Sequence, residues 1–329
     1  SCILRKSGVK WVSKKNNTDR MYPISDRIQE RKGRYIMESY EFLLFLAIIL
    51  FATKICGLFS RKFHMPQVVG ALLAGVILGP SVLNLISFDG ATGSYLEITA
   101  EIGVILLMFS AGLETDLTEL KENGVASFIT AGIGVLVPLF GGFLSYALYF
   151  HTDFGDFMEV LKAVFVGVVL TATSVSITVE TLRELGKLKG RVGTTILGAA
   201  VIDDIMGIIV LTVVTSIEDT SVNPFTVLLK IVLYFIVIAI VAFVMFKCKK
   251  LIEGAGEKRR VTIFAIAFCF LLSYVSEQFF GIADITGAYF AGLMLCNMKI
   301  GDYIKARAEV PSYLLFSPVF FASIVSRHS

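Results

Sequence analysis

The chain has 329 residues, of which 55% are hydrophobic and only 17% are charged, and its mean hydropathy is +0.77. Soluble domains carry about 25% charged residues, so this composition excludes a compact soluble fold and indicates a membrane protein. The net charge of +3 is uninformative, and the five widely spaced cysteines indicate neither a disulfide framework nor a metal site. The sequence contains no phosphate-binding loop, nucleophile triad or basic nucleic-acid patch, so we expect no enzyme, no cofactor and no nucleic-acid partner.

The first 36 residues differ from the rest, since they hold ten Lys or Arg against three acids and contain no apolar run. A signal peptide needs an apolar core, which this segment does not have. Met37, followed directly by an apolar stretch, is a more natural start. We therefore expect residues 1–36 to be a basic leader that is disordered or not native, and residues 37–329 to form one transmembrane domain.

Apolar stretches recur throughout residues 37–329. A helix needs about 20 mostly apolar residues to cross a hydrocarbon core of about 30 Å. On this basis we expect an all-α polytopic protein with about ten spans. They are predicted near residues 41–59, 66–87, 97–113, 125–150, 161–180, 190–216, 224–246, 260–280, 283–297 and 310–325.

The links between these spans alternate in charge. Basic residues follow the odd-numbered spans, from Arg61 and Lys62 after the first to Lys299, Lys305 and Arg307 after the ninth, whereas the other links are mostly acidic. Because Lys and Arg collect on the cytoplasmic side, we expect the first span to start outside and the basic loops to be cytoplasmic. The predicted location is the cell inner (plasma) membrane, with the lipid bilayer as a partner.

One pattern, Gly-Ala-x-x-Ala-Gly-x-x-Leu, occurs at residues 70–78 and again at 287–295. An odd number of predicted spans separates the starts of the two copies, so they cross the membrane in opposite directions. Chance recurrence of small residues in apolar helices is the alternative. We favour an inverted repeat, the common plan of secondary transporters, with 125–216 as core helices, 224–250 as a linker helix and 260–325 as a partial second repeat.

The second repeat would stop at its third helix, where the apolar segment ends in Ile324-Val325-Ser326-Arg327-His328-Ser329. We expect a truncated or frameshifted carboxyl end, and a short natural variant is the alternative. One hypothesis for this chain is therefore a fragment that does not transport ions.

The fifth span carries five hydroxyl residues between Leu170 and Thr178. In membrane helices such hydroxyls often only bond back to carbonyls of their own helix. The interpretation that we favour is a broken helix, whose freed carbonyls and hydroxyls can ligate a cation. At the end of this span, Glu180 and Arg183 form either a gate or a plain interfacial ion pair, and the ion pair is preferred.

Asp203 and Asp204 are the only charged residues between Val192 and Ser216. A single central Asp costs about 2.5 to 3.5 kcal/mol on insertion scales, so two in a row indicate water access, charged partners or a role in handling cations or protons. We favour the role with cations or protons. Successive helix residues point about 100° apart, so the two carboxylates need not face one cavity equally.

Four segments carry a resemblance to a known family: Ile98–Glu114, Thr171-Ala172-Thr173-Ser174, Val201-Ile202-Asp203-Asp204 and Ser317–Ile324. Together they resemble the second family of bacterial monovalent cation:proton antiporters, which includes spore-germination sodium antiporters and Kef-type potassium efflux systems. The resemblance covers roughly residues 40–324.

The resemblance implies secondary active exchange of Na⁺ or K⁺ for protons by alternating access, with a homodimer as the assembly. It implies that Asp204 is the essential carboxylate that holds the transported Na⁺ or K⁺, and that Asp203 is its neighbour. Thr171, Thr173 and Ser174 would flank the ion at the broken helix. A Kef-type gated K⁺ efflux system is the alternative within the same family.

Overall fold

The structure of the protein is a computed structural model that describes residues 3–6, 9–13, 21–86, 90–218, 223–254, 256 and 258–326. Three short strands form an antiparallel sheet in the order β1-β2-β3: β1 Ile3–Lys6, β2 Val9–Ser13 and β3 Met21–Pro23. This sheet and the first turns of α1 occupy the predicted leader, whose other residues lie outside the described part. The predicted chain end at residues 327–329 also lies outside it, and both expectations stay predictions.

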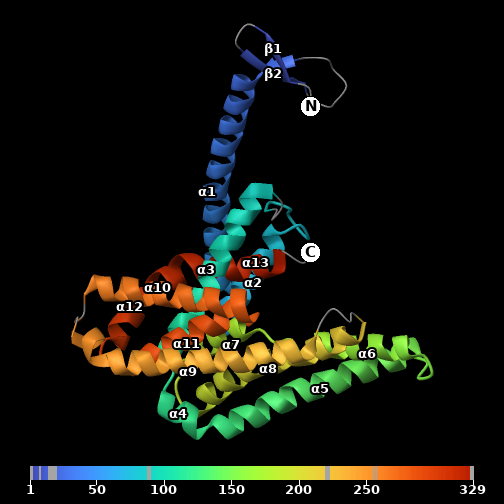
Figure 1. Ribbon diagram of the computed structural model, residues 1–329, viewed down its shortest axis with the longest axis vertical. Helices are drawn as coiled ribbons and strands as arrows, with labels where there is room; N and C mark the ends of the chain where they lie inside the picture. The colour runs from blue at the N-terminus through green and yellow to red at the C-terminus, as the bar shows by residue number, and fades with distance from the viewer. Residues whose placement is uncertain are drawn as a thin grey trace.

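All other regular structure in the described residues is helical (Figure 1). The helices are α1 Ile24–Lys62, α2 Gln67–Leu78, α3 Gly90–Glu114, α4 Leu117–Glu122, α5 Gly124–Phe150, α6 Phe157–Val169, α7 Val175–Glu184, α8 Arg191–Glu218, α9 Pro224–Gly254, α10 Arg259–Val275, α11 Asp284–Cys296, α12 Gly301–Pro311 and α13 Ser317–Ser326, with π-helical turns η1 Ser276–Phe280 and η2 Ser312–Phe316.

Six of the described helices are long and apolar enough to cross a membrane: α1, α3, α5, α8, α9 and α10. Two shorter apolar helices, α2 and α11, carry the two copies of the glycine pattern. The predicted helical, membrane-spanning class is confirmed, whereas the number of crossings stays a prediction.

The second predicted span is shorter than expected. Helix α2 ends at Leu78, because Gly79 stands before Pro80 and takes the extended conformation that a residue before proline prefers. The chain then folds back, and the Leu83 amide donates to the Ile77 carbonyl at 3.1 Å. Periodicity alone could not place this turn, since the residues that follow are also apolar.

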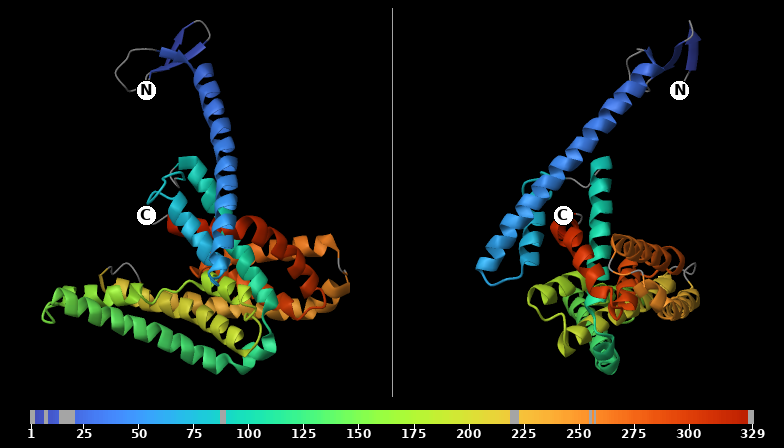
Figure 2. Two further views of the ribbon diagram at one scale, coloured as in Figure 1. Left: turned by 180° about the vertical axis from the view of Figure 1, so that it is seen from behind. Right: turned by 90° about the vertical axis from the view of Figure 1, so that its left-hand side faces the viewer.

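The helices form two groups that cross each other. Helices α5, α8 and α9 lie side by side and nearly parallel, whereas α1 and α3 run across them (Figure 1), as the two further views confirm (Figure 2). The main buried cluster lies where α3 packs on α11, around Leu107, Phe109 and Tyr289. Large apolar side chains cover the outer faces of α1, α5 and α9, as a bilayer-facing surface requires.

Glycines hold α2 and α11 in equivalent positions beside their neighbours in the chain. A Cβ at Gly70 of α2 would lie within 3.0 Å of the Cys56 carbonyl oxygen on α1. A Cβ at Gly287 of α11 would lie within 3.0 Å of the Leu272 carbonyl oxygen on α10. Real Cβ atoms essentially never come so close, so only glycine permits either helix to approach its predecessor in this way.

The second glycine of each copy makes the reciprocal contact across the repeats. Gly75 of α2 lies against the Ala322 carbonyl of α13, and Gly292 of α11 lies against the Phe109 carbonyl of α3. In the first repeat (α1, α2 and α3), α2 packs on α1 and on α13 of the second repeat. In the second repeat (α10, α11 and α13), α11 packs on α10 and on α3 of the first repeat. This exchanged packing confirms the predicted inverted repeat.

We predict that Gly292→Ala destabilises the protein by about 1 to 3 kcal/mol, because the added methyl group forces α3 and α11 apart. Gly132→Ala is the matched control, since a Cβ at this α5 position meets nothing within 4 Å. The control should be neutral or stabilising by up to about 1 kcal/mol, from helix propensity. Thermal unfolding in detergent can be followed with a thiol-reactive dye through the fully buried Cys269. Equal midpoints for the two variants would contradict the packing argument.

Candidate functional site

The predicted break in the fifth span is present. Helix α6 ends at Val169 and α7 begins at Val175, with an unwound segment between them. Ser174 caps α7, because its Oγ accepts a hydrogen bond from the Ile177 amide at 3.4 Å. Two helix ends therefore meet at this point, and a helix amino terminus favours nearby negative charge while carbonyls at a carboxyl terminus favour cations.

Asp203 lies next to this break, near the middle of the continuous helix α8. The Thr173 hydroxyl donates a hydrogen bond to Asp203 Oδ2. Asp203 is only 9% exposed, and its Oδ1 has no hydrogen-bond partner among the described residues. A buried carboxylate oxygen without a partner is costly, so the arrangement leaves room for a proton or a cation at this oxygen.

The other hydroxyls of the break bond to the local backbone. The Thr171 hydroxyl donates to the Val168 carbonyl at 2.7 Å, and the Thr178 hydroxyl donates to the Ser174 carbonyl at 3.0 Å. The alternative left open by the sequence, that these hydroxyls bond only to nearby backbone carbonyls, therefore holds for Thr171 and Thr178. Only Thr173 reaches the carboxylate pair.

Asp204 is partly buried and follows Asp203 on α8. It makes no hydrogen bond to the residues of the break, which agrees with the different direction of successive helix side chains. The structure thus brings Asp203 and Thr173 into direct contact. It places Asp204, Thr171 and Ser174 in the same region without a bond to Asp203.

Glu180 and Arg183 belong to a larger group of charges, which we call the buried ion cluster: Glu114, Glu180, Arg183, Lys305 and Tyr313. Arg183 lies 3.3 Å from Glu114 and 3.5 Å from Glu180, and Lys305 lies 3.2 Å from Glu114. The Arg183 guanidinium also stacks over the Tyr313 ring, 5.3 Å from its centre. The cluster joins α7 to α3, α12 and η2.

The sequence indicated the pair of Glu180 and Arg183 but not the other members. Glu114 ends an apolar span and Lys305 lies in a basic link, so each has a local explanation that does not require the other. With two acids and two bases the cluster is balanced in charge. Such balance is what makes the burial of these side chains tolerable, since the side chains of Arg183, Glu114 and Glu180 are all less than 10% exposed.

A cavity of about 380 Å³ lies beside the buried ion cluster and borders α1, α2, α7, η2 and α13. Lys54, Glu180 and Glu184 are its charged lining residues. The backbone N–H of Gln67 donates a hydrogen bond to the Glu184 carboxylate. Burial nevertheless raises the pKa of Glu184 above its ordinary value, so this carboxyl holds a proton more readily than a free one.

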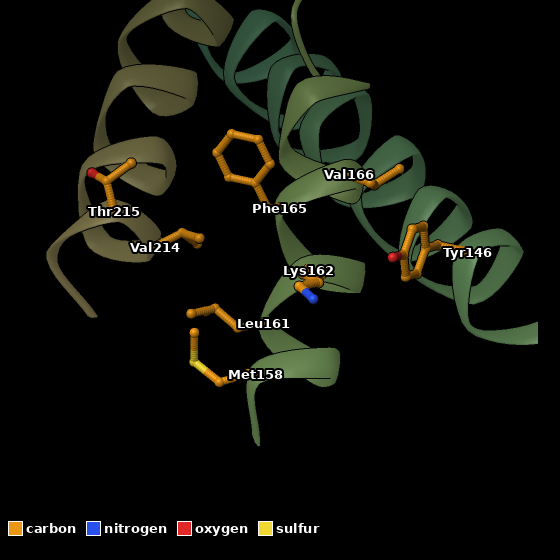
Figure 3. Close-up of a pocket in the computed structure, with 8 residues that line it drawn as sticks. All are labelled: Tyr146, Met158, Leu161, Lys162, Phe165, Val166, Val214 and Thr215. Atoms are coloured by element: carbon orange, nitrogen blue, oxygen red, sulfur yellow. The ribbon is translucent and has the colours of Figure 1, made fainter. Parts of the chain in front are cut away.

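A separate cavity of about 300 Å³ lies between α5, α6 and α8 (Figure 3). Leu161, Val214 and Met158 point into the space between α6 and α8, while Lys162 and Tyr146 lie on the side that faces α5. None of the predicted ion-site residues lines this cavity. This cavity is therefore separate from the carboxylate site.

Arg183→Gln should destabilise the protein by about 3 to 5 kcal/mol, because it removes the counter-charge of the buried Glu180 and leaves Glu114 with only the partly exposed Lys305. Lys249→Gln is the control, since Lys249 is 37% exposed and its ion pair with Glu253 spans 3.9 Å. An exposed pair of this kind contributes about 0 to 1 kcal/mol. Thermal unfolding in detergent compares the two, and a loss no larger than that of the control would show that the cluster is not a structural unit.

The fold and the site together define a polytopic membrane protein built as an inverted repeat, with a helix break beside buried carboxylates. The chain belongs to the transmembrane sodium/hydrogen exchanger family, whose model matches residues 45–325. The family predicted from the four sequence segments is thereby confirmed.

Similar proteins support this assignment. "Probable Na(+)/H(+) antiporter GerT" of Bacillus cereus is 40% identical over 281 residues, which cover 85% of this chain and 72% of that protein. "Na(+)/H(+)-K(+) antiporter GerN" of the same organism is 38% identical over 287 residues, covering 87% and 71%. The structure of the sodium proton antiporter MjNhaP1 from Methanocaldococcus jannaschii matches with a TM-score of 0.61 over 88% of this chain and 71% of that one. At 19% identity this last match shows the fold alone.

Proposed function

We propose that the protein exchanges Na⁺ or K⁺ for protons, as a secondary active transporter and not as an enzyme. The observation that carries the proposal is the buried Asp203, held by Thr173 from a helix break, in a chain of the sodium/hydrogen exchanger family. Relatives named as Na⁺/H⁺ and Na⁺/H⁺-K⁺ antiporters support the choice of ions.

The chemistry of exchange follows from competition for the same oxygens. A carboxylate pair in a site of low dielectric is costly when it is fully charged, so it holds either protons or a cation. Asp204 is the proposed essential carrier and Asp203 its coupled neighbour. Thr171 and Ser174, with freed carbonyls of the break, supply further oxygen ligands to the transported ion, and no resident cofactor is needed.

The Thr173 hydroxyl has two alternative partners, the Asp203 carboxylate and the transported cation. Without a cation, its hydroxyl hydrogen is shared with Asp203 Oδ2. When a cation binds, the same hydroxyl oxygen can turn a lone pair to the metal, so the exchange of partners requires rotation about one bond only. Such a small rearrangement suits a site that binds and releases a cation in every transport cycle.

The assembly and placement are proposed from surface chemistry. The outward faces of α1 and α10 are strongly apolar, with Phe51 71% and Phe264 72% exposed, and they suit a homodimer interface within the membrane. The basic links support a topology in which the corresponding loops lie in the cytoplasm and the first span starts outside. For a bacterial-type exchanger the membrane is the inner (plasma) membrane. Glu180 and Arg183 stay candidates for a gate, as members of the buried ion cluster.

We expect Asp204→Asn and Asp203→Asn each to reduce cation-dependent proton flux by at least tenfold, because a neutral amide can neither carry the proton nor balance the cation. Flux is measured in everted vesicles from cells that express the protein, with Na⁺, K⁺ and Li⁺ in turn. Asp302→Asn is the control, since this acid is exposed at the start of α12. If wild-type protein produces no flux with any of the cations, the antiporter proposal is wrong.

Thr173→Val should raise the cation concentration for half-maximal flux by about tenfold, equivalent to about 1.4 kcal/mol, because it removes a hydroxyl oxygen that would ligate the bound cation. Thr173→Ser should restore most of the affinity. Thr178→Val serves as the matched control, as its hydroxyl bonds only to a carbonyl of its own segment. An unchanged half-saturation in Thr173→Val would remove Thr173 from the site.

A further inference from the structure

Three carboxylates meet at a place that the exchange mechanism does not use. Glu101 of α3, Glu277 of η1 and Asp284 of α11 each offer an oxygen, and these oxygens lie within 4.8 Å of one another. Among the described residues, no Lys or Arg forms an ion pair with any of the three. Three negative charges are thus gathered without a protein counter-charge.

The backbone brings Glu277 and Asp284 together by an unusual route. Helix α10 passes into the π-helical turn η1, which contains Glu277, and π turns are rare and frequent at functional sites. Gly281 follows with φ +68, in the left-handed region that glycine adopts most readily, and reverses the chain. Asp284 is then the first residue of α11, and α11 packs along α3, which carries Glu101.

A fourth residue points to a ligand independently of the carboxylates. Ser273, one helical turn before Glu277, is only 2% exposed, and its Oγ has no oxygen or nitrogen partner in the described part of the chain, where it meets only the weakly bonding thiol of Cys269. Buried hydroxyls without partners are uncommon and call for an explanation. Ser273 lines the same cavity of about 340 Å³ as the three acids, together with the amide of Gln278.

We propose that Glu101, Glu277, Asp284 and Ser273 form a binding site for a divalent cation of the size of Ca²⁺. All the available donors are hard oxygens, the class that Ca²⁺ and Mg²⁺ prefer. Oxygens that share one Ca²⁺ at 2.3 to 2.6 Å lie at most about 5 Å apart, whereas around Mg²⁺ the limit is about 4.2 Å. All three carboxylate oxygens lie within 4.8 Å of one another, which is inside the limit for Ca²⁺. Ca²⁺ is proposed over Mg²⁺ because it accepts flexible oxygen coordination, whereas Mg²⁺ demands a near-ideal octahedron.

The proposed site is separate from the carboxylates of transport. Asp203 and Asp204 lie on α8, while the four residues here lie on α3, α10, η1 and α11. A cation at this point would tie the third helix of the first repeat to the first and second helices of the second repeat. Its role is that of a clamp between the repeats, and the inference does not depend on the transport activity.

The test is a Ca²⁺ titration of the purified full chain in detergent, by calorimetry and by thermal unfolding. We expect saturable binding with a dissociation constant of about 10⁻⁴ to 10⁻³ M, the range of extracellular Ca²⁺ modules. The unfolding midpoint should rise with Ca²⁺ concentration and rise less with Mg²⁺. Absence of saturable binding to a protein that unfolds cooperatively would overturn the proposal, and equal effects of the two ions would overturn the assignment of size.

Variants locate the binding. Glu101→Gln and Asp284→Asn should each weaken Ca²⁺ at least tenfold, and Ser273→Ala, which keeps every charge, should weaken it severalfold. Glu122→Gln, at an exposed acid of α4, should leave binding unchanged. Asp203→Asn tests whether Ca²⁺ instead enters the transport site. Binding that is lost in Asp203→Asn and retained in Asp284→Asn would refute the site.

Discussion

Direct contact between helix backbones is the constraint on which this structure depends. In a bilayer the apolar side chains gain little by leaving lipid, so helices associate through close packing of small residues. Gly292 and Gly112 face each other where α11 meets α3, and neither position has room for a Cβ. The main buried cluster surrounds this crossing, and the buried ion cluster forms at the end of α3, where Glu114 lies.

The carboxylate site relies on a different use of the backbone. Helix α8 is continuous, so it can hold Asp203 at a fixed depth without loose backbone groups. Its neighbour is interrupted between α6 and α7, where polar groups that a helix would satisfy become available. In the proposed exchange, the continuous helix supplies the charge and the broken helix supplies neutral oxygens. The Thr173 to Asp203 bond is the point at which the two meet.

The features predicted from sequence were those that one helix displays by itself. The acid pair in an apolar stretch, the run of hydroxyls that marks the broken span and the twin glycine patterns are each visible within a few turns. The pairing of Glu114 with Arg183 and Lys305 was not predictable, because it joins three segments far apart in the chain. The meeting of Glu101 with Glu277 and Asp284 likewise depends on a π turn and a left-handed Gly281, which have no reliable sequence signal.

The exchanged packing of the repeats has a consequence for how the protein folds. Gly75 lies early in the chain, and its partner Ala322 lies in the last described helix. During synthesis α2 is therefore inserted long before α13 exists, and the face of α2 that contacts α13 remains exposed to lipid until then. Folding that proceeds from the amino terminus during synthesis therefore cannot complete the packing of α2 before α13 has been made. The first repeat can complete its native packing only once the second repeat has been inserted, so the two repeats reach their native structure together.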